Sequence, residues 1–324
     1  MGLKPTYGRV SRYGLIAFAS SMDCVGPMTK DVEDSALMMS VMSGTDRRDA
    51  TSANLPRINF STNLGNDIRG TRIGLSPEYF RLRFPDTESG KIDEQPIAED
   101  IKQSVIDAAE KLAGAGAEII ENVPMPTIDY CVPAYFVISR VEAASNLHRY
   151  DGVKYGHRTQ YQEKELRNMY RRTRQEGFGL QPKLRILTGI YVSAAQYAEN
   201  YYERALRVRT LIKRDFDSAF DKGGKYRCDA LLTPTTPNTA FRIGEVYGDS
   251  VRMQYNDLFT VSSNLAGVPA ISIPSGLDSQ GKPIGIQLIG PHFSEANLLR
   301  IGRAYEIITA NEGWRNQIPE ILNM

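Results

Sequence analysis

Hydrophobic positions follow two different spacings along this chain, and together they predict a mixture of strands and helices. Residues 71–76 and 117–123 are short apolar runs, which is typical of buried strands. Between them, apolar residues recur every three or four positions from 97 to 112, which predicts an amphipathic helix. We therefore expect a strand–helix–strand unit with parallel strands and a right-handed crossover. Gly114 and Gly116 suit a left-handed helix end.

An earlier helix is expected after residue 28, followed by polar connections. Thr29 or Asp31 can accept a hydrogen bond at its start, and Gly44 ends it. Its expected apolar positions are Val32, Ala36, Leu37, Met39 and Val41. Residues 46–66 are rich in polar and turn-forming side chains, which predicts a surface connection. Residues 79–96 predict a long charged loop.

The second half of the chain predicts a helical region and then a return to strands. Residues 133–220 have a mostly helical pattern, with polar breaks near 151–152 and 177–182. Further strands are expected at 229–234, 270–274 and 284–290, and a last helix at 294–308. We therefore expect one α/β domain over residues 1–324, with a mixed, twisted sheet covered by helices.

Composition excludes several classes of protein. The 324 residues carry 39 Lys and Arg against 38 Asp and Glu, a formal net charge of +1, so binding of nucleic acid by bulk charge is not expected. A hydrophobic content of 41% excludes disorder as the main state. Residues 149–185 are locally basic and include Arg171, Arg172 and Arg174. This region is either a solvated helix face or a patch that faces RNA or an acidic partner.

The sequence has few of the residues that a metal site or histidine-based catalysis would need. The three cysteines are far apart and the three histidines form no cluster with them, so no metal site is expected. Residues 276–283 contain the G-x-x-x-x-G-K core of a phosphate-binding loop, but Pro283 follows where Ser or Thr is needed. Ser279 and Lys282 have the S-x-x-K spacing, but they lie in a predicted turn, which cannot direct the lysine at the serine hydroxyl as a helix would. A hairpin turn explains both motifs. No apolar stretch of membrane-spanning length is present.

Several blocks of sequence resemble the amidase signature family. They begin with Gly-Leu-Lys-Pro-Thr-Tyr-Gly-Arg-Val at residues 2–10 and recur along the chain in family order. The other blocks lie at 17–29, 139–146, 153–158, 207–212, 232–241, 255–261, 264–269 and 283–290. Within the family, the blocks are most similar to the glutaminase subunits of amidotransferases that act on Glu-tRNA(Gln). The resemblance implies the amidase signature fold and hydrolysis by Ser, a second Ser on a cis peptide, and Lys.

The sequence departs from the family at its start. In relatives the Lys, the cis-Ser and the nucleophilic Ser precede the Gly-Leu-Lys-Pro block, with which this sequence begins. We therefore expect the N-terminal catalytic segment to be absent, the domain to be partial, and this chain alone to be inactive. Lys4 and the pair Ser20-Ser21 belong to other blocks, and we interpret them as structural. No catalytic residue is assigned within the chain.

The resemblance does assign substrate-binding residues. Arg185 matches the arginine that holds the α-carboxylate of glutamine, a role that suits a planar guanidinium. Asp257 matches the carboxylate that holds the α-ammonium group, and Tyr135 matches a tyrosine whose hydroxyl contacts the same end of the substrate. Together these three residues would recognise a free amino acid.

The implied activity is hydrolysis of glutamine to supply ammonia for converting Glu-tRNA(Gln) to Gln-tRNA(Gln). The implied partners are the B and C subunits of the amidotransferase. The B subunit would handle tRNA, ATP and Mg²⁺, and the present chain would need no cofactor. The expected location is the bacterial cytoplasm or the mitochondrial or plastid matrix. Two alternatives stay open: a stand-alone amidase, which the paired Arg185 and Asp257 argue against, and a non-catalytic assembly module.

Overall fold

The computed structural model describes residues 1–85, 91–245 and 250–317, which form two compact units. Unit 1 combines residues 1–13 and 24–132 with the chain from 210 onwards. Unit 2 combines residues 14–23 and 133–209. Each unit therefore gathers segments that are distant in the sequence, and each is described by itself below.

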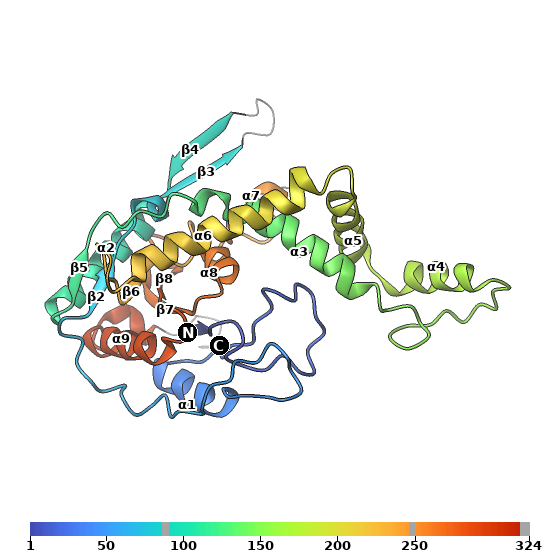
Figure 1. Cartoon of the computed structure of the whole chain (residues 1–324). Helices are drawn as coiled ribbons and strands as arrows, with labels where there is room; N and C mark the ends of the chain where they lie inside the picture. Colours follow the sequence, from blue (N-terminus) through green and yellow to red (C-terminus); the bar gives the residue numbers. More distant parts are fainter. Residues whose placement is uncertain (86–90, 246–249, 318–324) are drawn as a thin grey trace. The chain divides into compact units, whose positions relative to one another are not determined.

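Unit 1 is built on a six-stranded mixed sheet (Figure 1). In spatial order its strands are β1 (Gly2–Lys4), β7 (Ala270–Leu277), β8 (Pro283–Ile289), β6 (Ala230–Pro234), β2 (Arg72–Gly74) and β5 (Glu118–Ile120). β2 pairs in parallel with β6 and with β5, whereas the other three pairings are antiparallel. The expected mixed sheet is confirmed.

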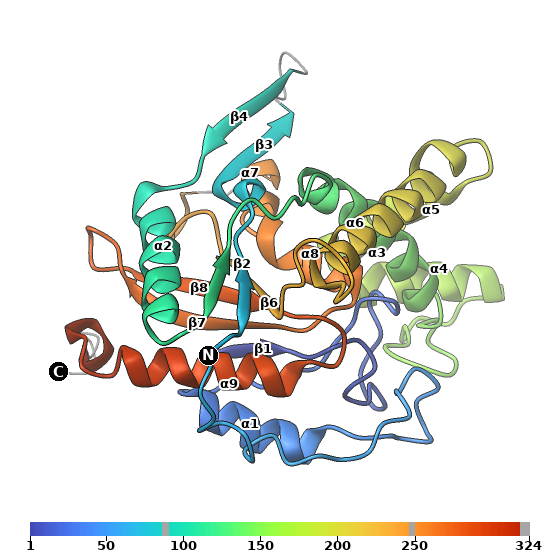
Figure 2. The same ribbon diagram turned by 60° about the vertical axis from the view of Figure 1, so that its left-hand side comes forward.

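Helices cover both faces of this sheet. Figure 2 shows α2 (Glu99–Gly114) and α9 (Glu295–Ile308) on the same side of the strands, and α1 (Val32–Met42) packs against α9. On the opposite face, the side-chain amide of Gln287 donates to the Phe259 carbonyl of α8 (Leu258–Ala266) at 3.2 Å. Unit 1 also contains α7 (Ser250–Tyr255) and the 3-10 turns Pro77–Phe80, Ile128–Tyr130 and Gly313–Asn316.

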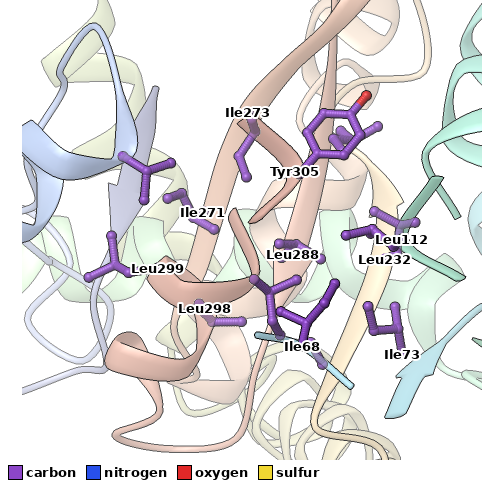
Figure 3. Packing of buried hydrophobic residues seen from close by; sticks show 14 of the residues in the cluster. Ile68, Ile73, Leu112, Leu232, Ile271, Ile273, Leu288, Leu298, Leu299 and Tyr305 are labelled. Carbon is purple, nitrogen blue, oxygen red and sulfur yellow. The ribbon is translucent and has the colours of Figure 1, made fainter. Parts of the chain in front are cut away.

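The core of unit 1 lies between the sheet and the α2–α9 face (Figure 3). Its side chains alternate along each strand because successive residues point to opposite faces. The labelled members are Ile68, Ile73, Leu112, Leu232, Ile271, Ile273, Leu288, Leu298, Leu299 and Tyr305. The predicted buried face of α2 is confirmed residue by residue, namely Ile101, Val105, Ala108, Ala109 and Leu112. Of the two glycines expected at its end, Gly114 is the last residue of α2, and only Gly116 has a positive φ, +97°.

The structure corrects the prediction of a charged loop at 79–96. A 3-10 turn (Pro77–Phe80) leads into an antiparallel hairpin of β3 (Arg81–Pro85) and β4 (Ile92–Pro96). Arg83 lies opposite Glu94 in the register, and their side chains form an ion pair at 3.1 Å. Cross-strand pairs of opposite charge stabilise such a ribbon without apolar alternation, so the hydrophobic pattern did not reveal it.

The first helix also differs in part from its prediction. Asp31 is the N-cap, and its carboxylate accepts a hydrogen bond from the Asp34 amide at 2.7 Å. Leu37 and Val41, expected in the core, are 54% and 77% exposed. The connection that follows is not only a surface segment, because Phe60 is 2% exposed and joins the core. Aromatic burial here depends on the neighbouring helices and not on a local period.

Unit 2 is helical, as expected. It contains most of α3 (Cys131–Leu147), all of α4 (Leu166–Gly177) and α5 (Leu180–Ser193), and a π-helical turn (Glu199–Glu203). It also contains the start of α6 (Arg204–Phe220), which continues into unit 1 at residue 210.

Of the three arginines named above from the basic region, two make contacts within unit 2. The Arg174 guanidinium donates to the carbonyl of Leu147, the last residue of α3, at 3.0 Å and to that of Tyr150 at 3.1 Å. Arg172 pairs with Glu163 at 2.6 Å. The guanidinium groups of Arg172 and Arg174 are therefore already bound to groups of the same unit, whereas Arg171 is exposed.

The expected hairpin turn at 276–283 is confirmed. β7 and β8 are antiparallel, and the Asp278 carboxylate accepts hydrogen bonds from the amides of Gln280 and Lys282, both at 2.8 Å. A strand follows the turn, and not the helix that a phosphate-binding loop requires.

Candidate functional site

Two of the three predicted substrate residues lie in unit 2. Tyr135 is on α3 and Arg185 is on α5, and both side chains are half-buried. The two helices approach closely at Gly189, where an added Cβ would lie 2.0 Å from the Arg140 carbonyl oxygen. Gly189 is four residues after Arg185 and so lies on the same side of α5. The packing of α5 on α3 thus sets the position of Arg185.

An aromatic ring supports the Arg185 side chain. The central carbon of its guanidinium lies 5.4 Å from the centre of the Phe18 ring, a cation–π contact. Within the part of the chain that the structure describes, no carboxylate forms an ion pair with Arg185. The guanidinium is thus held by an aromatic ring while its charge remains available for an external anion.

The segment that carries Phe18 is fastened to the helices by two serines. The Asn146 amide donates to the Phe18 carbonyl at 3.1 Å and to the Ser20 hydroxyl at 2.7 Å. The Ser21 hydroxyl donates to Glu142 at 2.5 Å and accepts from Arg209 at 2.6 Å. These contacts fit the structural role that we expected for Ser20 and Ser21.

A second arginine, which the sequence reasoning missed, lies beside this group. Arg140 is 7% exposed, stacks on the Phe136 ring with its guanidinium carbon 3.5 Å from the ring centre, and donates to the Ser139 hydroxyl at 3.0 Å. Burial, together with the nearby positive charge of Arg185, lowers the pKa of Arg140 to about 10. One available signal was that Arg140 is the sole basic residue in the sequence of α3.

Asp257 belongs to unit 1 and occupies the N-cap position of α8. Its carboxylate does not accept the usual capping hydrogen bond. Although the residue is exposed, the surrounding protein desolvates the carboxyl group in part and raises its pKa above the ordinary value. The structure therefore brings Tyr135 and Arg185 into one unit and places Asp257 in the other, with its carboxylate uncommitted to the cap.

Lys4 is enclosed in unit 1, in strand β1. Its ammonium group donates to the Pro5 carbonyl at 2.9 Å. Burial lowers the pKa of Lys4, and the neighbouring Cys24 and Glu295 oppose this shift. A contact with a backbone carbonyl satisfies the amine but provides no nucleophile for it to activate, in keeping with the structural interpretation.

A polar hollow elsewhere in unit 1 contains none of the predicted site residues. It is lined by Asn63, Asn66, Asp67, Arg69, Gly70, Thr71, Asp229, Ala296, Asn297 and Arg300. The Arg69 guanidinium is already paired with Asp67 at 2.5 Å, and Arg300 donates to Asn297 at 2.7 Å. This hollow therefore offers less free charge than the arginines of unit 2.

The described residues show neither a metal-binding cluster nor a membrane-spanning helix. In residues 1–85, 91–245 and 250–317, no three His, Cys, Asp or Glu side chains are grouped so that they could hold a metal ion. Of the helices in the described parts of the chain, none combines the length and the apolar character needed to span a membrane.

Comparison with known proteins gives consistent results. Residues 1–299 match the model of the family described as Amidase. The A subunit of the glutamyl-tRNA(Gln) amidotransferase of Halothermothrix orenii is 46% identical over 94% of this chain and 60% of that protein. The corresponding protein of Dinoroseobacter shibae, which has the same name, is 48% identical over 94% of this chain and 58% of that protein. The chain thus spans about 60% of the length of the curated relatives that it matches.

Solved structures agree with the fold. The crystal structure of the glutamyl-tRNA(Gln) amidotransferase A subunit from Thermotoga maritima matches with a TM-score of 0.70 and 35% identity, over 94% of this chain and 57% of that one. A bacterial aryl acylamidase of the amidase signature family matches with a TM-score of 0.70 at 21% identity, over 97% of this chain and 59% of that one. The expected amidase signature fold is thereby confirmed.

Proposed function

This chain belongs to the amidase family, and on that basis we propose that it is part of the glutaminase subunit of a glutamyl-tRNA(Gln) amidotransferase. The complete protein would hydrolyse the side-chain amide of glutamine and release ammonia. The ammonia would then convert Glu-tRNA(Gln) to Gln-tRNA(Gln) on a partner subunit.

One observation in unit 2 carries this proposal. The Arg185 guanidinium rests on the Phe18 ring without a carboxylate partner among the described residues. A pre-positioned guanidinium is suited to a bidentate grip on a carboxylate, which every free amino acid has and a hydrophobic amide lacks. The aromatic support limits the side-chain entropy that binding would cost.

The proposal gives each predicted residue a role. Arg185 binds the α-carboxylate of glutamine, Tyr135 contacts the same end of the substrate, and Asp257 binds the α-ammonium group. The nucleophilic Ser, the cis-Ser and the Lys are not assigned to any of the 324 residues, so the chain supplies substrate recognition.

The partners follow from the same proposal. The B and C subunits of the amidotransferase would complete the complex. The B subunit would handle tRNA with ATP and Mg²⁺, and the glutaminase would hold no cofactor. The relatives named above are bacterial, which favours the bacterial cytoplasm over an organelle.

The proposal is tested by ammonia release from glutamine, using the full-length protein assembled with its partner subunits. Arg185→Ala should lower kcat/KM by about 30-fold or more, mainly through KM, because an uncompensated carboxylate costs roughly 2 kcal/mol or more. Arg185→Lys should recover only part of the loss. Gln181→Ala, an exposed change in the first turn of the same helix, is the matched control and should have no effect.

The alternatives give different results in the same assay. A stand-alone amidase would hydrolyse aryl or fatty amides faster than glutamine and would be indifferent to Arg185→Ala. A non-catalytic module would show no glutamine-dependent ammonia release in any form. Either outcome would overturn the proposal.

A further inference from the structure

Arg140 is a buried cation that the assigned roles do not use. It is 7% exposed, and a guanidinium carries five N–H donors. Its one hydrogen bond within the described residues goes to the Ser139 hydroxyl, and the Phe136 ring covers one face of the guanidinium. No carboxylate from those residues pairs with it. A buried charge without a counter-charge is unfavourable unless something outside the chain compensates it.

The position of Arg140 indicates what that compensating group is. Its carbonyl oxygen lies against Gly189, one helical turn after Arg185 on the same side of α5. The positive charge of Arg185 acts on Arg140 and disfavours its charged form. Two arginines without acidic partners among the described residues therefore lie on packed helices of one unit, each within about one helical turn of the contact between α3 and α5 and each against the ring of its own phenylalanine.

We propose that Arg140 is a second substrate-binding arginine, which shares the α-carboxylate of the amino-acid substrate with Arg185. This inference rests on the proposed function, since it extends the role assigned to Arg185. A carboxylate has two oxygens with about four acceptor positions, enough for two guanidinium groups. Its negative charge would also offset the repulsion between them.

The pair determines specificity for a free α-carboxylate. Two guanidinium groups left beside each other without an anion are unfavourable, so a substrate that lacks the carboxylate forfeits this compensation as well as its hydrogen bonds. The site should therefore select glutamine over 4-aminobutanamide, which is glutamine without its α-carboxylate.

The test measures KM and kcat for both substrates with the full-length assembled protein. Arg140→Met keeps a long side chain but removes the charge. It should raise KM for glutamine about 10-fold or more, consistent with the loss of a charged hydrogen bond, and leave kcat little changed. KM for 4-aminobutanamide should stay the same. Arg140→Lys should restore part of the affinity, and the exposed Arg171→Met is the matched control.

Each outcome decides between explanations. Equal losses on both substrates would show that Arg140 only maintains the structure, and would overturn the inference. An unchanged KM for glutamine in Arg140→Met, beside a raised KM in Arg185→Ala, would also overturn it while leaving the proposed function intact. If neither substitution affects glutamine, the proposed function fails too.

A second measurement covers the case in which Arg140→Met does not fold. Acetate at increasing concentration should compete with glutamine in the unmodified protein, because it presents the same carboxylate. In Arg140→Lys, whose charge is retained but whose planar fork is lost, the inhibition constant for acetate should rise by the same factor as KM for glutamine. An unchanged constant for acetate would count against the two-arginine site.

Discussion

At the scale of single residues, chemistry and environment contribute separately to the site. The resemblance selected Arg185, Tyr135 and Asp257 by their place in sequence blocks, and the structure adds the surroundings of each. Arg185 rests on Phe18, whereas the Asp257 carboxyl is partly desolvated although exposed. The contribution of Arg140 could not be predicted in the same way, since its contact with Gly189 and its proximity to Arg185 depend on how another helix, α5, packs on α3.

Asp257 leads to a prediction about pH. Desolvation raises the pKa of its carboxyl, so on acidification the group becomes neutral at a higher pH than an ordinary aspartate does. Below that pKa, KM for glutamine should rise by about tenfold per pH unit, because a neutral carboxyl does not attract the α-ammonium group. The measurement is the ratio of KM for glutamine to KM for glutaramate, which lacks the α-amino group.

The ratio removes effects of pH on the catalytic groups, which both substrates share. Asp257→Asn provides the control, since it should raise KM for glutamine at neutral pH and abolish the change in the ratio. A ratio that stays constant on acidification would contradict the role of Asp257.

At the scale of secondary-structure elements, local sequence patterns predicted where helices and strands lie better than they predicted which side chains of those elements are in contact. The β2–α2–β5 unit follows from periodicity alone, and so does the buried face of α2. The β3–β4 hairpin does not, because its stability comes from cross-strand ion pairs such as Arg83 with Glu94. Likewise, Leu37 and Val41 have the right spacing for a core face but are exposed, since α9 covers only one side of α1.

The contact between α3 and α5 can be tested at Gly189. Replacing glycine by alanine inside a helix normally stabilises it by about 1 kcal/mol. Here the new methyl group would lie 2.0 Å from the Arg140 carbonyl oxygen, so Gly189→Ala should instead lower the free energy of unfolding by roughly 1–3 kcal/mol. Urea denaturation followed by circular dichroism measures the change.

A matched substitution is available at the end of α2. Nothing lies within 4 Å of the position that a Cβ would take at Gly114, so Gly114→Ala should leave the stability unchanged or slightly increased. If Gly189→Ala proved as stable as Gly114→Ala, the close approach of α3 and α5 would be wrong.

At the scale of the whole molecule, residues near the end of the chain contact residues near its beginning. Glu295, at the start of α9, accepts a hydrogen bond from the Thr6 amide at 2.8 Å and lies 3.9 Å from the Arg9 guanidinium. Glu306, near the end of the same helix, accepts from the Val32 amide at 3.0 Å. Buried acidic side chains of α9 thus hold the first part of unit 1 in place.

This arrangement predicts a large effect of one substitution. Arg9 and Glu295 are 5% and 0% exposed, so Glu295→Ala would leave Arg9 buried without a counter-charge. The free energy of unfolding should fall by roughly 3–5 kcal/mol, a large part of the total for an ordinary domain. Thermal and urea unfolding would show the loss.

The comparison is with an exposed ion pair between α1 and the same helix, α9. Glu33 is 58% exposed and pairs with Arg303 at 3.3 Å, so Glu33→Ala should change the stability by less than about 1 kcal/mol. Similar losses for both variants would show that the contact between Arg9 and Glu295 is not buried in solution.

The sequence by itself determined the β2–α2–β5 unit, the apolar face of α2, the hairpin turn at Asp278 and the family to which the chain belongs. These features depend on near neighbours in the chain or on blocks of residue identity. Only the tertiary structure decided which charges are paired and which are free. Arg174, Arg140 and Glu295 are all charged side chains on helices, yet Arg174 donates to backbone carbonyls, Arg140 donates to the neighbouring Ser139 hydroxyl, and Glu295 accepts from a backbone amide that is distant in the sequence. The physical reason is that the state of a charge is set by the groups around it in space, and folding brings those groups from remote parts of the chain.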